Sequence, residues 1–169
     1  MSVISNTTVL SNFASIGQLD LLRRLYKVLY ISTEVYEEIS TGLEEGYSFY
    51  QDIPRLIYPF NELGWLHVAT MSTEELRLSG ELPARFHKGE ASCLAIAGQR
   101  VWLLLTDDSA ARAEALQRGI RLSGSIGCLV LAVERGHCDV MQANAWLQDM
   151  IAHDYRSPVT DLSPLLKRR

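Results

Sequence analysis

Short apolar runs alternate with helical patterns along most of this chain, and that alternation is what most restricts its fold. Apolar runs predict buried strands at 3–5, 28–31, 65–69, 102–105 and 120–122. Helical patterns lie at 9–16, 19–25, 33–42, 73–82, 90–97, 109–118, 126–136 and 139–153. Because helices separate the strands, we expect βα units and a mainly parallel sheet in a three-layer α/β/α sandwich.

The same pattern indicates one domain that covers residues 1–169. A chain of 169 residues is the size of one domain, and its 47% of hydrophobic residues can fill a sizeable core. Residues 43–62 are less regular and contain Gly46, Pro54 and Pro59, so we expect an irregular insertion with one short helix there. We expect the basic run at 167–169 to be a frayed end.

Charge and cysteine usage exclude several classes of function. The net charge of -4 predicts no strongly basic surface, so a nucleic-acid partner would need a local patch, a metal ion or both. Cys93, Cys128 and Cys138 show no paired spacing, which argues against a disulfide framework and a zinc site. The sequence contains neither a signal-peptide pattern nor an apolar run of about 18 residues, so we expect a cytoplasmic protein that does not enter a membrane.

Polar residues stand where the predicted strands end. Asn6 follows the first strand, and Asp107 and Asp108 follow the strand at 102–105. Since the carboxyl ends of parallel strands share one edge of a sheet, these side chains are expected to meet there. Glu38, on the helix after the second strand, and Glu90, at the start of the helix before the 102–105 strand, complete the candidate group.

The candidate group suggests metal chemistry. Clustered carboxylates repel one another unless a cation lies between them, and Mg²⁺ and Mn²⁺ prefer oxygen ligands. Such a site activates water and stabilises a phosphate ester's transition state, which points to phosphodiester hydrolysis. Each residue taken alone also has an ordinary explanation, namely a turn or cap at Asn6, dipole-complementing acids at Glu38 and Glu90, and a helix cap at Asp107 or Asp108.

Other polar residues allow two explanations each. Arg112 lies one helical turn beyond Asp108, where it either touches a phosphate or an acid of the site, or forms a surface ion pair. Ser123 and Ser125 precede a helix N-terminus and either contact an anion or simply cap the helix. No residue pattern supports a Ser-His-Asp or Cys-His enzyme, and the glycine-rich nucleotide motifs are missing.

Four stretches resemble one known family. The opening "VISNTTVLSNFASIGQLDLLRRLY" is similar to the start of PIN-domain proteins, and "VLYISTEVYEEI" and "GEASCLAIA" resemble their segments that carry the next two acids. The most specific stretch, "LLLTDDSAARAEALQRGIRLSGSIGCLVLAVERG", is similar to a PIN subgroup related to VapC toxins. Together the matches span roughly residues 2 to 136.

The resemblance implies a Mg²⁺- or Mn²⁺-dependent ribonuclease that acts on RNA. Position by position, the acids correspond to Asn6, Glu38, Glu90 and either Asp107 or Asp108. The relatives commonly form homodimers and are held inactive by a small antitoxin protein. By analogy, the dimer interface is expected at residues 9–25 and 43–62.

Asn6 departs from the family pattern at its first acid, which is normally Asp. An amide still offers one oxygen but no charge, so metal binding is expected to be weaker. The chain is therefore an inactivated nuclease, a degenerate module that binds RNA or a partner, or a weakly active enzyme. An unrelated flavodoxin-like binding domain is a further alternative, and it would make all the acid positions coincidental.

Overall fold

The computed structural model describes residues 1–166, so the expected basic end at 167–169 lies outside the described residues. The strands are β1 (Val3–Ser5), β2 (Leu29–Ser32), β3 (Ile57–Tyr58), β4 (Leu66–Ala69), β5 (Leu103–Leu105) and β6 (Leu122–Ser123). The helices are α1 (Thr7–Ser15), α2 (Leu19–Tyr26), α3 (Thr33–Glu44), α4 (Thr73–Glu81), α5 (Lys88–Arg100), α6 (Ser109–Gln117), α7 (Ser125–Glu134), α8 (Val140–Ala152) and α9 (Ser163–Leu166). Two 3-10 turns, η1 (Ser48–Tyr50) and η2 (Ile53–Leu56), precede β3.

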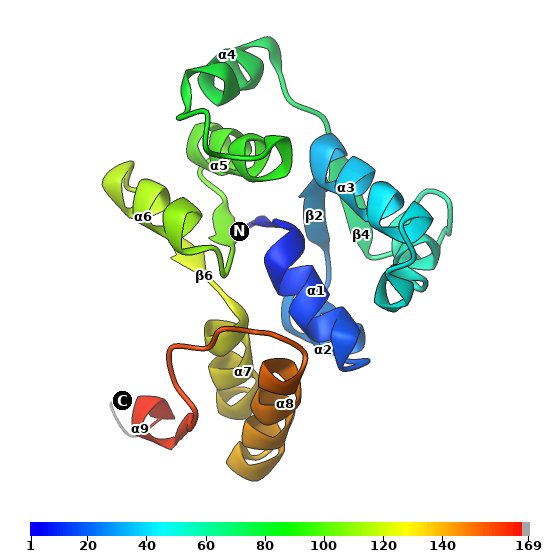
Figure 1. Ribbon diagram of the computed structural model, residues 1–169, viewed down its shortest axis with the longest axis vertical. Helices are drawn as coiled ribbons and strands as arrows, with labels where there is room; N and C mark the ends of the chain where they lie inside the picture. Colours follow the sequence, from blue (N-terminus) through cyan, green and yellow to red (C-terminus); the bar gives the residue numbers. More distant parts are fainter. Residues whose placement is uncertain (167–169) are drawn as a thin grey trace.

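The strands form one parallel sheet in the order β3-β4-β2-β1-β5-β6. Helices cover it on both faces, which confirms the expected three-layer α/β/α architecture. In Figure 1, α1 and α3 lie in front of the sheet, and α7 and α8 lie side by side below it. The order reverses at β1, which runs between β2 and β5, and ligands of such sheets bind beside the carboxyl ends at this kind of switch point.

The core explains why the short apolar runs become strands. Ile4, Leu29, Ile31, Leu66 and Leu105 are fully buried, as residues of a parallel sheet covered on both faces should be. Cys93 and Cys128 are buried and free, and they fill the core as small apolar residues.

The segment at 43–62 differs from the prediction. Helix α3 does not end at Gly42 but continues to Glu44. Gly42 instead allows close packing against Tyr50, where a Cβ would lie 2.8 Å from the ring. The segment then forms η1, η2 and the edge strand β3, which pairs with β4 through Ile57 and Tyr58. A strand of this length is too short to show a periodic pattern in the sequence.

Candidate active site

Asn6 is the N-cap of α1 and joins the ends of β1 and β5. Its side chain is buried, and its Oδ1 accepts hydrogen bonds from the backbone N of Thr8 (3.2 Å) and from Thr8 Oγ1 (2.7 Å). Its Nδ2 donates to Thr106 Oγ1, 2.6 Å away, just beyond β5. The ordinary explanation of Asn6 as a helix cap is therefore correct, and because its cap holds the side chain at the sheet edge, Asn6 also reaches the candidate site.

Asn6, Glu38 and Glu90 line one pocket of about 220 Å³, together with Thr7, Thr8 and His87. The pocket lies beside the carboxyl end of β1, between the N-terminal parts of α1, α3 and α5. The structure thus brings together three of the predicted positions from three separate elements.

Glu38 joins three helices through its carboxylate. Oε1 accepts a hydrogen bond from the backbone N of Gly89 (3.0 Å), and Oε2 accepts one from Thr7 Oγ1. A Cβ at residue 89 would lie 2.3 Å from Oε1, so only glycine allows this approach. Both oxygens are therefore engaged, and Glu38 fixes the walls of the pocket.

Glu90 is half-buried in the first turn of α5. Its Oε2 accepts a hydrogen bond from the backbone N of His87, 3.2 Å away. The pKa of Glu90 is raised above its ordinary value, first by burial and then by the negative charge of Asp108, with a smaller contribution from Glu38. The hydrogen bond from the backbone of His87 and the charge of its side chain lower the pKa of Glu90 and oppose these effects in part. Glu90 is thus a carboxylate whose charge lacks full compensation.

Asp108 is the N-cap of α6, where its Oδ2 accepts a hydrogen bond from the backbone N of Ala111, 2.7 Å away. Its own N–H donates to Thr106 Oγ1 at 3.2 Å, so one hydroxyl holds both Asn6 and Asp108. This arrangement lets the charge of Asp108 act on Glu90.

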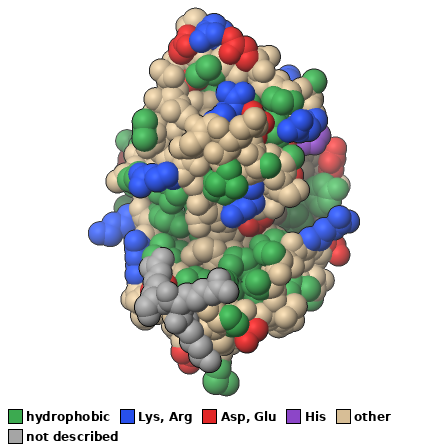
Figure 2. All heavy atoms as spheres, turned by 90° about the vertical axis from the view of Figure 1, so that its left-hand side faces the viewer, with side chains coloured by type: hydrophobic (Ala, Val, Ile, Leu, Met, Phe, Trp, Pro, Cys, Tyr) green, Lys and Arg blue, Asp and Glu red, His purple; other side chains and the backbone are tan. Residues whose placement is uncertain are grey.

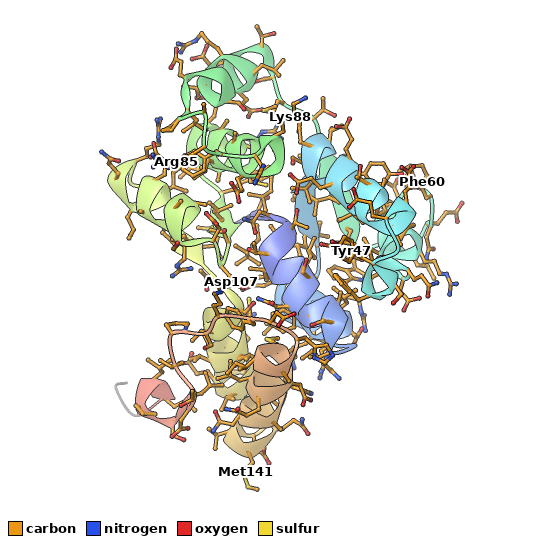
Figure 3. The ribbon with its side chains drawn as sticks, viewed as in Figure 1. Tyr47, Phe60, Arg85, Lys88, Asp107 and Met141 are labelled. Carbon is orange, nitrogen blue, oxygen red and sulfur yellow. The ribbon has the colours of Figure 1, made fainter. Side chains whose placement is uncertain are left out.

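Asp107 points away from this group and serves as a structural anchor. Its Oδ1 accepts a hydrogen bond from the backbone N of Ser125 (2.8 Å), and its Oδ2 accepts from Asn12 Nδ2 (2.8 Å) and from Ser125 Oγ. Figure 3 shows Asp107 where α1, α6 and α7 approach one another. Through these hydrogen bonds, the Asp107 carboxylate connects the end of β5 to α1 and α7.

The three residues considered for substrate contact are placed differently. Ser125 is fully buried, and its amide and hydroxyl both bind Asp107. Its side chain is therefore not accessible to a substrate. Arg112 donates through Nη1 to the backbone O of Thr106 (2.9 Å) instead of pairing with Asp108. Arg112 and Ser123 line a second cavity, which Asp107 also borders.

The donors of the first pocket suit a hard divalent ion bound largely through water. Within residues 1–166, no three side chains among His, Cys, Asp and Glu are arranged to hold a metal ion by themselves. Mg²⁺, however, is commonly held by one or two carboxylates, with waters and substrate phosphates completing its shell. Glu38 and Glu90 are the carboxylates of this pocket, and Asp108, which does not line it, adds negative charge that acts on Glu90.

Sequence reasoning missed the hydroxyl groups that support the site. Thr7 holds Glu38, Thr8 holds Asn6, and Thr106 holds Asn6 and Asp108. Their signal is their position, since each threonine stands within two residues of a candidate residue near the end of a strand.

Comparison with known proteins agrees with this geometry. Residues 2–168 match a family model described as a PIN domain. The chain belongs to the PIN-domain family. No curated protein matches this PIN domain. PIN domains are generally hydrolytic nucleases and typically use divalent metal ions. No helix within residues 1–166 has the length and apolar character needed to span a membrane.

Proposed function

We propose that this PIN domain is a Mg²⁺- or Mn²⁺-dependent endoribonuclease whose site comprises Asn6, Glu38, Glu90 and Asp108. The observation that carries the proposal is the pocket that Asn6, Glu38 and Glu90 line together. In it, the half-buried Glu90 meets the negative charges of Asp108 and Glu38, which His87 opposes. A divalent ion, when bound, supplies an activated water and neutralises charge on the phosphate. Glu90, Asp108 and Asn6 would hold it, and Glu38 would keep the pocket open.

The residues have separate tasks under this proposal. Glu90 and Asp108 attract the cation and orient a phosphate group beside it. Asn6 contributes a neutral oxygen where a carboxylate would contribute charge, so the affinity for metal is lower than with an aspartate. Asp107 holds the β5 end against α1 and α7 and takes no part in the chemistry.

Cleavage of a fluorophore-quencher RNA tests the proposal. We expect cleavage in the presence of Mn²⁺ or Mg²⁺ and none in the presence of EDTA. Glu90→Gln should abolish it, because the amide keeps the size but removes the charge. Glu62→Gln, at an exposed glutamate outside the pocket, is the matched control. Cleavage that persists in EDTA or in Glu90→Gln would contradict the proposal.

Asn6 favours a second candidate function, a degenerate PIN module that binds RNA or a partner without cleaving it. Its amide lowers the charge of the site, and its oxygen already accepts two hydrogen bonds. Binding of uncleaved RNA that Mn²⁺ does not change would support this alternative over the enzyme.

A toxin role with an antitoxin partner and a homodimer belongs to the same proposal. It is supported by the similarity of the segment from Leu103 to Gly136 to VapC-like toxins. Exposed apolar side chains also gather in the segment at 47–63, namely Tyr47, Phe49, Tyr58, Phe60 and Leu63. Tyr47 and Phe60 lie on the α3 side of the molecule in Figure 3. Light scattering of Phe60→Glu tests this interface, and a parent that is strictly monomeric at micromolar concentration would contradict the dimer.

A further inference from the structure

A second cavity of about 520 Å³ is bordered by Asp107, which does not line the Glu90 pocket. Its walls come from α6, β6, the first turn of α7 and the segment at 155–165. Its apolar lining includes Leu122, Ile126, Val159 and Leu165. Figure 2 looks onto the side of the molecule that carries α6 and α9, where apolar and basic side chains lie next to one another. The volume falls within the range of small-molecule sites, about 300–1,000 Å³.

Two arginines give this cavity a basic character that the chain as a whole lacks. Arg112 is held in place by its hydrogen bond to the backbone O of Thr106, and Arg156 is exposed. Neither forms an ion pair with a carboxylate among residues 1–166. The carboxylate of Asp107 also borders the cavity, but three donors already bind it. The guanidinium groups are therefore available to an anionic ligand.

The position of the cavity connects it to the candidate active site. Asp107 and Asp108 are consecutive, yet Asp107 borders this cavity whereas Asp108 acts on Glu90. Ser109, the residue after Asp108, also lines the cavity, so the two sites approach each other at the turn from β5 to α6. Apolar walls beside the guanidinium groups of Arg112 and Arg156 suit an unstacked base with its phosphate, because arginine both stacks on bases and binds phosphates.

We propose that the cavity lined by Arg112, Leu122 and Leu165 binds one nucleotide of a single-stranded RNA, next to the nucleotide whose phosphate lies at the Glu90 pocket. This inference rests on the proposed ribonuclease function and assigns that function a substrate class. The base packs between Leu122, Ile126 and Val159, and Arg112 and Arg156 bind the phosphate. Double-stranded RNA cannot enter, because its bases are paired and stacked.

Fluorescence anisotropy with a labelled short single-stranded RNA tests the inference on the full chain in EDTA, where no cleavage occurs. Arg112→Ala should weaken binding about tenfold through loss of a charge-assisted contact. Leu165→Trp should weaken it similarly by filling the cavity. Arg55→Ala and Leu116→Trp, at exposed residues outside the cavity, are the matched controls. Thermal unfolding of each variant serves to check that it is folded.

Cross-linking gives a readout that does not depend on affinity or activity. A single-stranded RNA that carries 4-thiouridine should cross-link to the segment at 155–165, and Leu165→Trp should abolish the cross-link. Tight competition by free uridine monophosphate would overturn the assignment to RNA, because it would identify a site for a free nucleotide.

The outcomes separate this inference from the proposed function. If the parent cleaves the RNA with Mn²⁺ but the two cavity variants bind it like the parent, the cavity inference alone is overturned. A parent that neither binds nor cleaves RNA overturns both.

Discussion

The carboxylate of Asp107 accepts hydrogen bonds from Asn12 and from both the amide and the hydroxyl of Ser125, whereas that of Asp108 accepts one from Ala111. Both residues follow Thr106 at the end of β5, and their side chains bind different elements. The charge of Asp108 raises the pKa of Glu90, while Asp107 is surrounded by donors. Of these two neighbouring acids, Asp107 therefore stabilises the fold, and Asp108 adds negative charge beside Glu90.

The largest expected effect concerns Asp107. Asp107→Ala leaves the amide and hydroxyl of Ser125 and the side-chain amide of Asn12 without their acceptor. Unpaired buried donors cost about 1–3 kcal/mol each, so we expect the free energy of unfolding to fall by about 3 kcal/mol. Urea denaturation measures this loss.

Asp108→Asn is the matched control for that measurement. Asparagine caps a helix as well as aspartate does, so the free energy of unfolding should change by less than about 0.5 kcal/mol. If Asp107→Ala and Asp108→Asn lower the free energy of unfolding equally, the structural difference proposed between the two residues is wrong.

The next effect concerns the charge at residue 6. Asn6→Asp should tighten Mn²⁺ binding roughly tenfold, because each added anionic oxygen strengthens a hard-cation site. Without metal the variant should be slightly less stable, since a new charge meets Glu90. With saturating Mn²⁺ it should become more stable than the parent, because the ion binds the folded state.

Calorimetric titration with Mn²⁺ measures the change at residue 6, and Asn61→Asp at an exposed asparagine is the control. Unchanged Mn²⁺ affinity in Asn6→Asp would show that Asn6 acts as a helix cap alone.

The smallest effect is a dependence of stability on pH. The pKa of Glu90 is raised in the folded protein, so its favourable contribution exists below the unfolded pKa of about 4.3 and is lost as the pH rises through the folded pKa. In EDTA at pH 7, Glu90→Gln should therefore be more stable than the parent, by less than about 1 kcal/mol because water screens a half-buried group. The difference should vanish near pH 4.

Glu75 provides the opposite case for the same pH series. Its pKa is lowered, chiefly by the hydrogen bond from Arg100, so its contribution exists above the unfolded pKa and is lost as the pH falls. Glu75→Gln should thus be less stable than the parent at pH 7. If Glu90→Gln shows the same sign as Glu75→Gln, the charge of Glu90 is compensated after all.

Local patterns were sufficient to predict most of the fold and part of the site. Apolar runs identify buried strands, and parallel strands place their carboxyl ends at one edge, where Asn6 lines a pocket together with Glu90 from the first turn of α5. The edge strand β3 was missed because its pairing with β4 depends on tertiary contacts and not on a pattern of its own.

The choice between Asp107 and Asp108 depends on partners that are distant in sequence. Asn12 lies 95 residues from Asp107, and Ser125 lies 18 residues away. No local spacing encodes these contacts. The cavity beside Arg112 was equally hidden, since the segment at 155–165 that closes it has no helical or strand period.

Mn²⁺-dependent cleavage of RNA by Asp108→Asn and Asp107→Asn, compared at a temperature where both are folded, tests the central claim most directly. Asp108→Asn should lower kcat/KM about 100-fold or more while its free energy of unfolding stays at the parent value, because the variant removes charge from the site and keeps the cap. Asp107→Asn should lose stability and keep cleavage within a few-fold of the parent. Full activity in Asp108→Asn together with loss of activity in a folded Asp107→Asn would contradict the account.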